Sequence, residues 1–192
     1  MANINDFKSI LKGGGARANQ FQVTMPFPGF AAEGGETRQM SFLCKATNLP
    51  GQTIAETPVP FRGRVLYIAG DRTFETWTTT MFNDTDFAIR NAFERWMNEI
   101  NSLSDNSGLT NPSDYQVDAF VDQLDRAGQV IKSYTFRGLF PLTIGNIDLA
   151  YDSDNAVEEF EVTWRYQHFT TSNVGAEVSI TNPTAGTSAD FD

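Results

Sequence analysis

The sequence predicts a mainly β, antiparallel domain with one flanking α-helix. Several segments alternate apolar and polar residues with a period of two, which is the pattern of a half-buried strand. One segment carries an apolar stripe with the period of a helix. A turn sequence at 125–128 separates two of the strand segments closely enough for a hairpin. At 192 residues, the chain has the size of one domain with short extensions.

The composition narrows the function classes. The chain carries 14 Lys and Arg against 24 Asp and Glu, a net charge of −10, which argues against a protein that grips nucleic-acid phosphates. Hydrophobic residues make up 40% of the chain, enough for a sizeable core. The single cysteine, Cys44, excludes a disulfide framework and a cysteine-based zinc cluster, and the single histidine, His168, leaves little imidazole chemistry. No apolar run approaches the ~18 residues of a membrane span, and residues 1–12 lack a signal-peptide pattern, so we expect a soluble protein made inside the cell.

The first part of the chain predicts a short helix followed by strands. Residues 3–12 have an amphipathic helical pattern that ends at the glycines of 13–15. No Gly-Lys-Ser/Thr follows these glycines, so they are not a phosphate-binding loop. Alternation predicts one strand over 21–25 and another over 40–46. Residues 26–35 between them contain Pro and Gly and are expected to form a hairpin loop.

Residues 48–63 are expected to form a long connection. They contain three prolines and two glycines, too many breakers for an internal strand. Connections of this length in a compact domain tend to be functional or disordered. After this segment, 64–69 is a short apolar strand, and 72–82, which is rich in Thr, is an extended strand.

The residues after this strand predict an amphipathic helix. Asp84 or Asp86 can cap its start, where the helix dipole also favours a carboxylate. Its apolar stripe consists of Ile89, Phe93, Trp96, Ile100 and Leu103. We interpret this stripe as core packing against the sheet rather than a cofactor pocket, and 104–113 as the exit loop.

The rest of the chain predicts further strands and a polar tail. The expected strands cover 115–121, 130–138, 147–151 and 160–168, with Val174–Ile180 as a possible addition and 182–192 as a frayed end. Negative charge is concentrated here, because residues 138–192 hold nine acids and one base, whereas the first 137 hold 15 acids and 13 bases. Such asymmetry indicates either a negative functional surface or a face that aids solubility.

No catalytic motif is found in the sequence. His168 shares an alternating face with Trp164 and Tyr166, which favours an interior or interface histidine over a catalytic base. The Asp-rich segment 152–155 resembles the start of a calcium loop, but the later ligand positions do not fit, so we interpret it as a polar turn. Paired carboxylates of the glycosidase type remain open because acids are plentiful. We predict no enzyme activity, no metal and no cofactor.

Three stretches resemble a known family. They are Phe42-Leu43-Cys44-Lys45-Ala46-Thr47-Asn48-Leu49-Pro50-Gly51, then Ala69-Gly70-Asp71-Arg72-Thr73-Phe74-Glu75-Thr76-Trp77-Thr78 followed by Asn83-Asp84, and last Arg137-Gly138-Leu139-Phe140-Pro141 with Gly145, Asp152-Ser153-Asp154-Asn155 and Phe160-Glu161-Val162-Thr163. In this order they resemble tail tube proteins of contractile-tailed, T-even-like bacteriophages, over residues 19–169. Residues 26–38 are longer than the hairpin expected in the family, and the segment after Phe169 is extra.

The resemblance implies an antiparallel β-sandwich or barrel-like tail-tube fold, related to type VI secretion tube proteins. It divides the chain into an N-terminal arm (1–18), a tail tube β domain (19–169) and a polar C-terminal extension (170–192). It also implies that six copies form a ring and that rings stack into a hollow tube inside a contractile sheath. The expected partners are other copies of the chain, the tail sheath protein, baseplate and tail-terminator proteins, and a tape measure protein in the lumen before ejection. DNA would pass without specific binding, there would be no membrane anchor, and the protein would be synthesised in the host cytoplasm and reside in the virion.

Two sets of residues are candidates within this function. The breaker-rich connection is expected to contact neighbouring subunits through Leu49, Pro50, Gly51, Ile54, Val59 and Phe61. A negative lumen would repel DNA phosphates and keep the duplex near the axis, and the candidate lumen acids are Asp148, Asp152, Asp154, Glu159 and Glu161.

Other functions stay open at this point. A tube protein of a contractile injection or secretion machine would have the same fold and a protein cargo. A tube-capping or baseplate tube protein is a related possibility. From a different class, a carbohydrate-binding or hydrolytic β-sandwich is the remote alternative.

Overall fold

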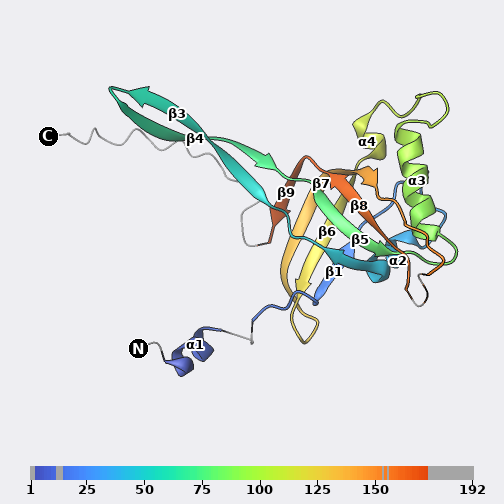
Figure 1. Ribbon diagram of the computed structural model, residues 1–192, viewed down its shortest axis with the longest axis horizontal. Helices are drawn as coiled ribbons and strands as arrows, with labels where there is room; N and C mark the ends of the chain where they lie inside the picture. Colours follow the sequence, from blue (N-terminus) through green and yellow to red (C-terminus); the bar gives the residue numbers. More distant parts are fainter. Residues whose placement is uncertain (1–2, 12–14, 153, 155, 173–192) are drawn as a thin grey trace.

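The computed structural model describes residues 3–11, 15–152, 154 and 156–172. It consists of a β body flanked by helices and a long two-stranded arm that projects from it (Figure 1). The elements are α1 (Ile4–Ile10), β1 (Phe21–Thr24), α2 (Glu36–Leu43), β2 (Cys44–Thr47), β3 (Gln52–Phe61), β4 (Arg64–Phe74), β5 (Trp77–Phe82), α3 (Ala88–Ile100), α4 (Pro112–Tyr115), β6 (Val117–Leu124), β7 (Val130–Ile144), β8 (Glu159–Arg165) and β9 (His168–Thr171).

The body is a sheet that folds over on itself at β7. The strand order is β1-β6-β7-β8-β5-β2, with β9 also paired to β7, and every pairing is antiparallel. The first part of β7 pairs with β6 and β9, and its last part pairs with β8. Gly138 lies near the end of the first part with φ 63°, a conformation that favours glycine. The predicted antiparallel, sandwich-like body with a flanking helix is confirmed.

Aromatic side chains fill the space between the two halves. Trp77 of β5 stacks on Phe136 of β7 with ring centroids 4.5 Å apart, so the halves face each other across the core. The three tryptophans are fully buried, and burying an indole requires a partner for its N–H. Each has one: Trp77 donates to the Asn48 carbonyl (2.9 Å), Trp96 to the Tyr115 carbonyl (2.8 Å) and Trp164 to the Thr79 hydroxyl (2.9 Å).

Helix α3 closes one side of this core with the predicted stripe. Ile89, Phe93 and Trp96 are buried, and Phe93 meets Trp164 edge-on at 5.2 Å. Of the two predicted caps, the Asp84 carboxylate accepts the Ala88 N–H at 3.0 Å. The assignment of Leu103 to the stripe is wrong, because α3 ends at Ile100 and the Leu103 side chain is 95% exposed.

The strand predicted over 40–46 is confirmed only from residue 44 onward, where β2 begins, and is wrong for residues 40–43. Residues 36–43 form α2, because Glu36 and Met40, one helical turn apart, are the buried positions and Phe42 points to solvent. The expected hairpin over 26–35 is also wrong. β1 pairs with β6 and β2 pairs with β5, so the two strands lie in opposite halves of the body.

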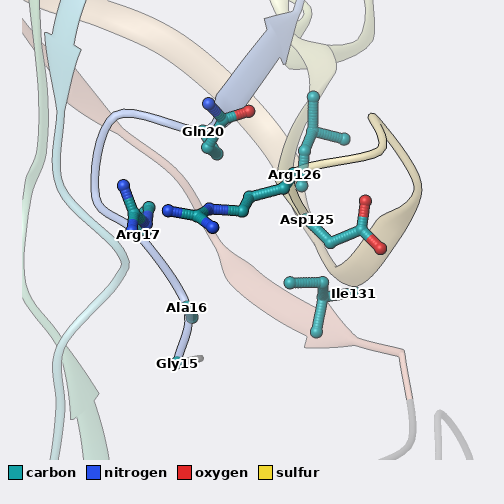
Figure 2. A pocket seen from close by; sticks show the side chains of 8 residues that line it. Gly15, Ala16, Arg17, Gln20, Asp125, Arg126 and Ile131 are labelled. Carbon is teal, nitrogen blue, oxygen red and sulfur yellow. The ribbon is translucent and has the colours of Figure 1, made fainter. Parts of the chain in front are cut away.

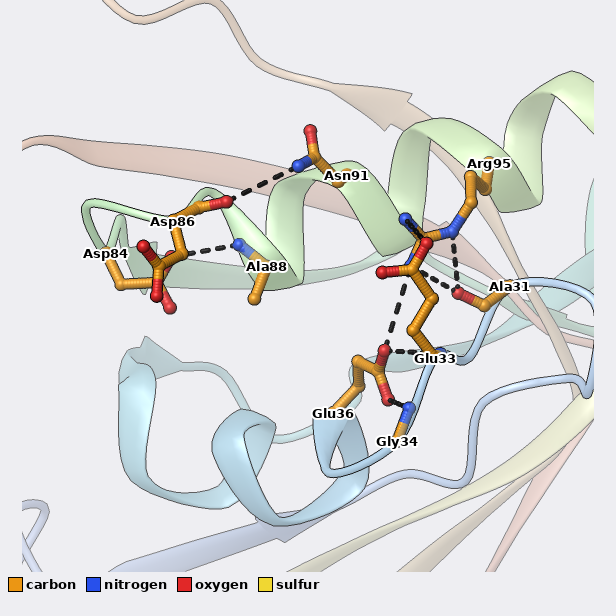
Figure 3. A network of polar contacts seen from close by, with 9 residues as sticks. All are labelled: Ala31, Glu33, Gly34, Glu36, Asp84, Asp86, Ala88, Asn91 and Arg95. Carbon is orange, nitrogen blue, oxygen red and sulfur yellow. Dashed lines mark hydrogen bonds and ion pairs between the residues drawn. The ribbon is translucent and has the colours of Figure 1, made fainter.

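A polar network ties α2 to α3 (Figure 3). The buried Glu36 carboxylate accepts the N–H groups of Glu33 (2.6 Å) and Gly34 (2.8 Å), and Arg95 of α3 lies 3.7 Å away. Arg95 also donates two hydrogen bonds to the Ala31 carbonyl. Burial alone raises the pKa of Glu36, but the backbone hydrogen bonds and the Arg95 charge outweigh it and hold that pKa below its ordinary value of 4.5.

Three smaller expectations for the C-terminal part are corrected. Residues 147–151 form no strand, since this segment is part of the exposed loop between β7 and β8. The long strand over 160–168 ends at Arg165, and β9 then begins at His168 on the other side of the fold. His168 is therefore exposed rather than interior. The Val174–Ile180 expectation and the end of the tail lie outside the described residues.

Candidate functional site

The arm is the most unusual surface of the molecule. β3 and β4 pair in nine registered positions from Gln52↔Phe74 to Phe61↔Arg64. The connecting residues Arg62 and Gly63 both have positive φ, 45° and 82°, as in the two-residue turn that suits a twisted hairpin. The prediction of a loop over 48–63 is thus wrong for residues 52–61. Pro58 and Pro60 fit in a strand here because they are two residues apart on an edge, where their missing N–H groups face away from β4.

Both faces of the arm are apolar and exposed. Cross-strand partners share a face, so Val59 and Leu66 lie on one face, and Tyr67 and Val65 lie on the other, opposite prolines. Every residue of β3 is exposed, and the Phe61 and Tyr67 side chains are 66% and 62% exposed. The large exposed apolar side chains are Ile54, Val59, Phe61, Val65, Leu66, Tyr67 and Ile68. A contiguous apolar surface of this kind marks an interaction site.

The candidate contact residues separate into two groups. Ile54, Val59 and Phe61 lie on the arm, whereas Leu49, Pro50 and Gly51 lie at its base. The candidate contact set missed Val65–Ile68 on β4, which the sequence predicts only as part of a short apolar strand. The signal that could have found them is the turn at Arg62-Gly63, which pairs this run with the proline-rich strand and removes it from the body.

Asn48 fastens the arm to the body. Its side-chain oxygen accepts the N–H of Thr78 at 3.1 Å and the Thr78 hydroxyl at 3.2 Å, and its carbonyl accepts the Trp77 indole N–H. At the base of the arm, Arg72 donates to the Gln52 side chain at 2.7 Å. The arm therefore leaves the body at a point fixed by hydrogen bonds to β5.

The five candidate lumen acids are not brought together. Glu159 and Glu161 lie on the outward-facing side of β8, and Asp148, Asp152 and Asp154 lie on the exposed loop between β7 and β8. Glu159 forms an ion pair with Lys45 at 2.6 Å, which neutralises its charge. On β8, Glu161 thus contributes more net negative charge than Glu159.

A hollow lies at the end of the body where β5 ends and β8 begins. Its first part, about 350 Å³, is lined by residues 146–150 and 156–159. Its second part, about 370 Å³, is lined by Asn83, Asp84, Thr85, Phe87, Val157 and Glu158. Both parts share Val157 and Glu158, and we call them together the end groove. Its lining combines carboxylates with the exposed apolar side chains of Phe87, Leu149 and Val157.

A smaller pocket of about 160 Å³ lies between the chain before β1 and the turn after β6 (Figure 2). Arg126 extends toward Arg17 across it, and the Asp125 carboxylate accepts N–H groups of its own turn. Its lining holds no nucleophile beside a base.

The thiol of Cys44 is poorly suited to act as a nucleophile. Cys44 is buried, which raises the pKa of its thiol to about 12. Within residues 3–11, 15–152, 154 and 156–172, no group of three or more His, Cys, Asp or Glu side chains could hold a metal ion. In the same part of the chain, no helix is both long and apolar enough to cross a membrane.

Comparisons with known proteins agree with the fold. The family model described as phage tail tube protein matches residues 16–172. The chain is 33% identical over 168 residues to the tail tube protein of Serratia phage KSP90, covering 86% of this chain and 95% of that one. It is 36% identical over 157 residues to tail tube protein gp19 of Enterobacteria phage T4, covering 81% and 91%.

Solved structures share the fold at lower identity. One neighbour comes from the baseplate of the anti-feeding prophage (TM-score 0.59, 13% identity, 82% of this chain and 95% of that chain). Another comes from the sheath–tube complex of the extracellular contractile injection system PVC (TM-score 0.51, 14% identity, 86% and 96%). The sequence relatives are structural proteins rather than enzymes, as predicted for this chain. With more than two thirds of its length matched by the family model and by relatives above 30% identity, the chain belongs to the phage tail tube protein family.

Proposed function

We propose that this virion tail tube protein acts as one of six subunits in a ring, and that the rings stack into a hollow conduit for the phage genome inside a contractile sheath. The observation that carries this proposal is the arm, whose two apolar faces are exposed in the single chain. An exposed apolar surface of this kind marks a site that other subunits can cover.

The strands of the body can form the wall of such a ring. Each half of the folded sheet has four strands: β1, β6, β7 and β9 in one, and β7, β8, β5 and β2 in the other. Six copies that each contribute four strands would close into a barrel of about 24 strands, wide enough for a lumen. Closure also covers edge strands that would otherwise recruit other chains.

The arm is suited to contacts beyond one ring. Because both of its faces are apolar, one flat partner covers only half of its exposed surface. A contact with the neighbour in the ring on one face and with the next ring on the other satisfies both. Heterologous contacts of this kind, which do not close, generate a stacked filament.

The solved neighbours support the choice of the other partners. They come from a sheath–tube complex, a sheath and tube terminator, and a baseplate. For this chain we propose the tail sheath, baseplate and tail-terminator proteins as partners, and a tape measure protein in the lumen before ejection. The subunits would be made in the host cytoplasm and assembled into the virion tail.

A negative lumen remains part of the proposal, with Glu161 as its leading residue. In a six-membered ring, one Glu161→Lys change would reverse about six charges at one level of the channel, and a positive ring attracts DNA phosphates. Tubes of this variant should retain double-stranded DNA that wild-type tubes do not. Glu99→Lys, the same charge change on α3, is the matched control and should leave DNA retention unchanged. Equal retention by Glu161→Lys and wild-type tubes would contradict the lumen assignment.

The direct test of the assembly is electron microscopy of the purified full chain. We expect six-fold rings and stacked tubes with a central channel. A monodisperse monomer at all concentrations and salts would contradict the proposal.

A tube for protein cargo is the second candidate, because the solved neighbours with TM-scores above 0.5 come from injection systems. Their identity of 12–15% shows the fold alone, whereas the relatives at 33–36% come from phages. Analysis of the material inside native particles separates the two, since DNA supports the phage tube and a protein cargo supports the second candidate.

A further inference from the structure

The tip of the arm differs in charge from the rest of the chain. Residues 58–67 contain Arg62 and Arg64 and no acid, in a chain of net charge −10. The same tip carries the exposed side chains of Val59, Phe61 and Val65. It therefore presents two guanidinium groups beside apolar surface.

The end groove has the opposite charge with a similar apolar content. Residues 146–159 contain five acids and no Lys or Arg. Asp148 and Glu158 line the groove beside the apolar side chains of Leu149 and Val157, which are 80% and 64% exposed. The groove can therefore accept a ligand that is cationic and apolar at once.

The two surfaces lie at opposite ends of the body. The arm leaves the body next to Trp77, which pairs with Trp164, and β5 then runs to Phe82, which pairs with Glu159 at the end groove. In Figure 1 the arm extends to the left, away from the lower right end of β5. The tip of an arm therefore points away from the groove of its own subunit, and a second copy placed head to tail presents a groove to it.

We propose that the arm tip of one subunit docks into the end groove of a subunit in the next ring, with Arg62 and Arg64 against Asp148 and Glu158. This inference rests on the proposed function and names the acceptor surface for the stacking contact. Each subunit offers one tip and one groove at opposite ends, so the contact repeats without closing. Charge complementarity fixes the polarity of stacking, since two tips repel each other and two grooves repel each other.

The contact predicts a salt-dependent assembly. Exposed charges are screened over about 8 Å at physiological ionic strength, so rim ion pairs weaken as salt rises. The apolar part of the contact does not weaken in the same way. The concentration needed for tube formation by the wild-type chain should therefore rise between low and high NaCl, while rings persist.

The test is a charge exchange in the full chain, measured by pelleting of tubes and by electron microscopy. The Arg62→Glu/Arg64→Glu variant should form rings but require at least about tenfold more protein for tubes, because like charges then meet at the contact. Asp148→Arg/Glu158→Arg should show the same defect. The chain that combines all four changes should recover tube formation. Arg17→Glu/Arg126→Glu, the same charge change at exposed arginines on the body, is the matched control and should stack normally.

The outcomes separate this inference from the function on which it rests. The acceptor assignment is wrong, and the tube function stands, if the tip variant stacks like the wild type or if the control variant loses as much tube formation as the tip variant. The same holds if the variant with all four changes still fails to form tubes although it unfolds at the wild-type temperature. If a groove variant unfolds early, the salt dependence of wild-type stacking decides, and a salt-independent tube overturns the inference. If the wild-type chain forms neither rings nor tubes, the proposed function itself fails.

Discussion

The body and the arm use apolar residues in opposite ways. In the body, aromatic side chains are buried between two sheet halves and a helix, and each tryptophan N–H has an acceptor. In the arm, residues of similar hydrophobicity are exposed on both faces. An isolated two-stranded hairpin is marginally stable in water, so the arm depends on contacts that the single chain does not supply. The body is therefore organised for folding and the arm for assembly.

The largest expected effect concerns the centre of the body. Trp164→Ala removes a buried indole that contacts Trp77, Phe93 and Trp96, and should lower the free energy of unfolding by about 3–5 kcal/mol. The arm variant Phe61→Ala is the control, since surface substitutions usually change stability by about 0.5 kcal/mol or less. Urea unfolding monitored by fluorescence and circular dichroism measures both. A loss at Phe61 equal to that at Trp164 would remove the distinction between the two regions.

The next effect concerns the polar network that joins α2 to α3. Glu36→Gln leaves buried donors poorly paired and should cost about 1–3 kcal/mol of stability. Because the folded-state pKa of Glu36 is lowered, its contribution is present above the ordinary value of 4.5 and is lost as the pH falls below it. The wild type should therefore lose more stability between pH 6 and acid pH than the variant. Glu33→Gln, which alters an exposed partner of Arg95, is the control and should leave this pH dependence in place.

A smaller effect is expected where the arm joins the body. Asn48→Ala removes the two hydrogen bonds that Thr78 donates through its N–H and its hydroxyl. Both hydrogen bonds are exposed, so water can replace them in part, and the free energy of unfolding should fall by about 1 kcal/mol. Its effect on tube formation should be larger than its effect on unfolding, because the direction of the arm is no longer fixed. Thermal unfolding and pelleting of the same preparation compare the two. An Asn48→Ala variant with lower unfolding temperature and normal tubes would show that the junction does not orient the arm.

The smallest expected effect concerns Cys44, whose thiol should not react in the folded chain. Burial and a thiol pKa of about 12 predict that Cys44 in the folded chain is not alkylated by iodoacetamide at pH 8 within hours, whereas it is in urea. Mass spectrometry detects the adduct. Rapid labelling of the native chain would show that β2 opens readily and that the body is less rigid than its packing indicates.

The sequence predicts the body better than the arm because the two regions produce different patterns. A half-buried strand alternates, as in β8, and an amphipathic helix carries one stripe, as in α3, so the pattern predicts both elements and where they start, although each ends three residues earlier than predicted. The arm is apolar on both faces, so its β4 strand has the pattern of a buried strand and its β3 strand, with two prolines, the pattern of a loop. What distinguishes the arm strands from a buried strand and a loop is that β3 and β4 pair only with each other, in a sheet separate from the body.

The alternating pattern also gave a wrong prediction where α2 ends and β2 begins. Met40, Phe42 and Cys44 alternate, yet the first two belong to α2, where Glu36 is buried through hydrogen bonds that hydropathy does not reveal. The Glu159–Lys45 ion pair is likewise a contact between β8 and β2 that spacing along the chain cannot predict. The sequence therefore identifies the candidate acids by their charge and, for Glu159 and Glu161, by the polar face of a strand, whereas the ion pair of Glu159 is visible only in the fold.

The central claim, that assembly covers and stabilises the arm, is tested most directly by hydrogen–deuterium exchange of the single chain and of assembled tubes. We predict that amides of β3 and β4 exchange rapidly in the single chain and become strongly protected in tubes, while amides of β5 and β8 are protected equally in both. Amides of β3 and β4 that exchange at the same rate before and after assembly would contradict the account.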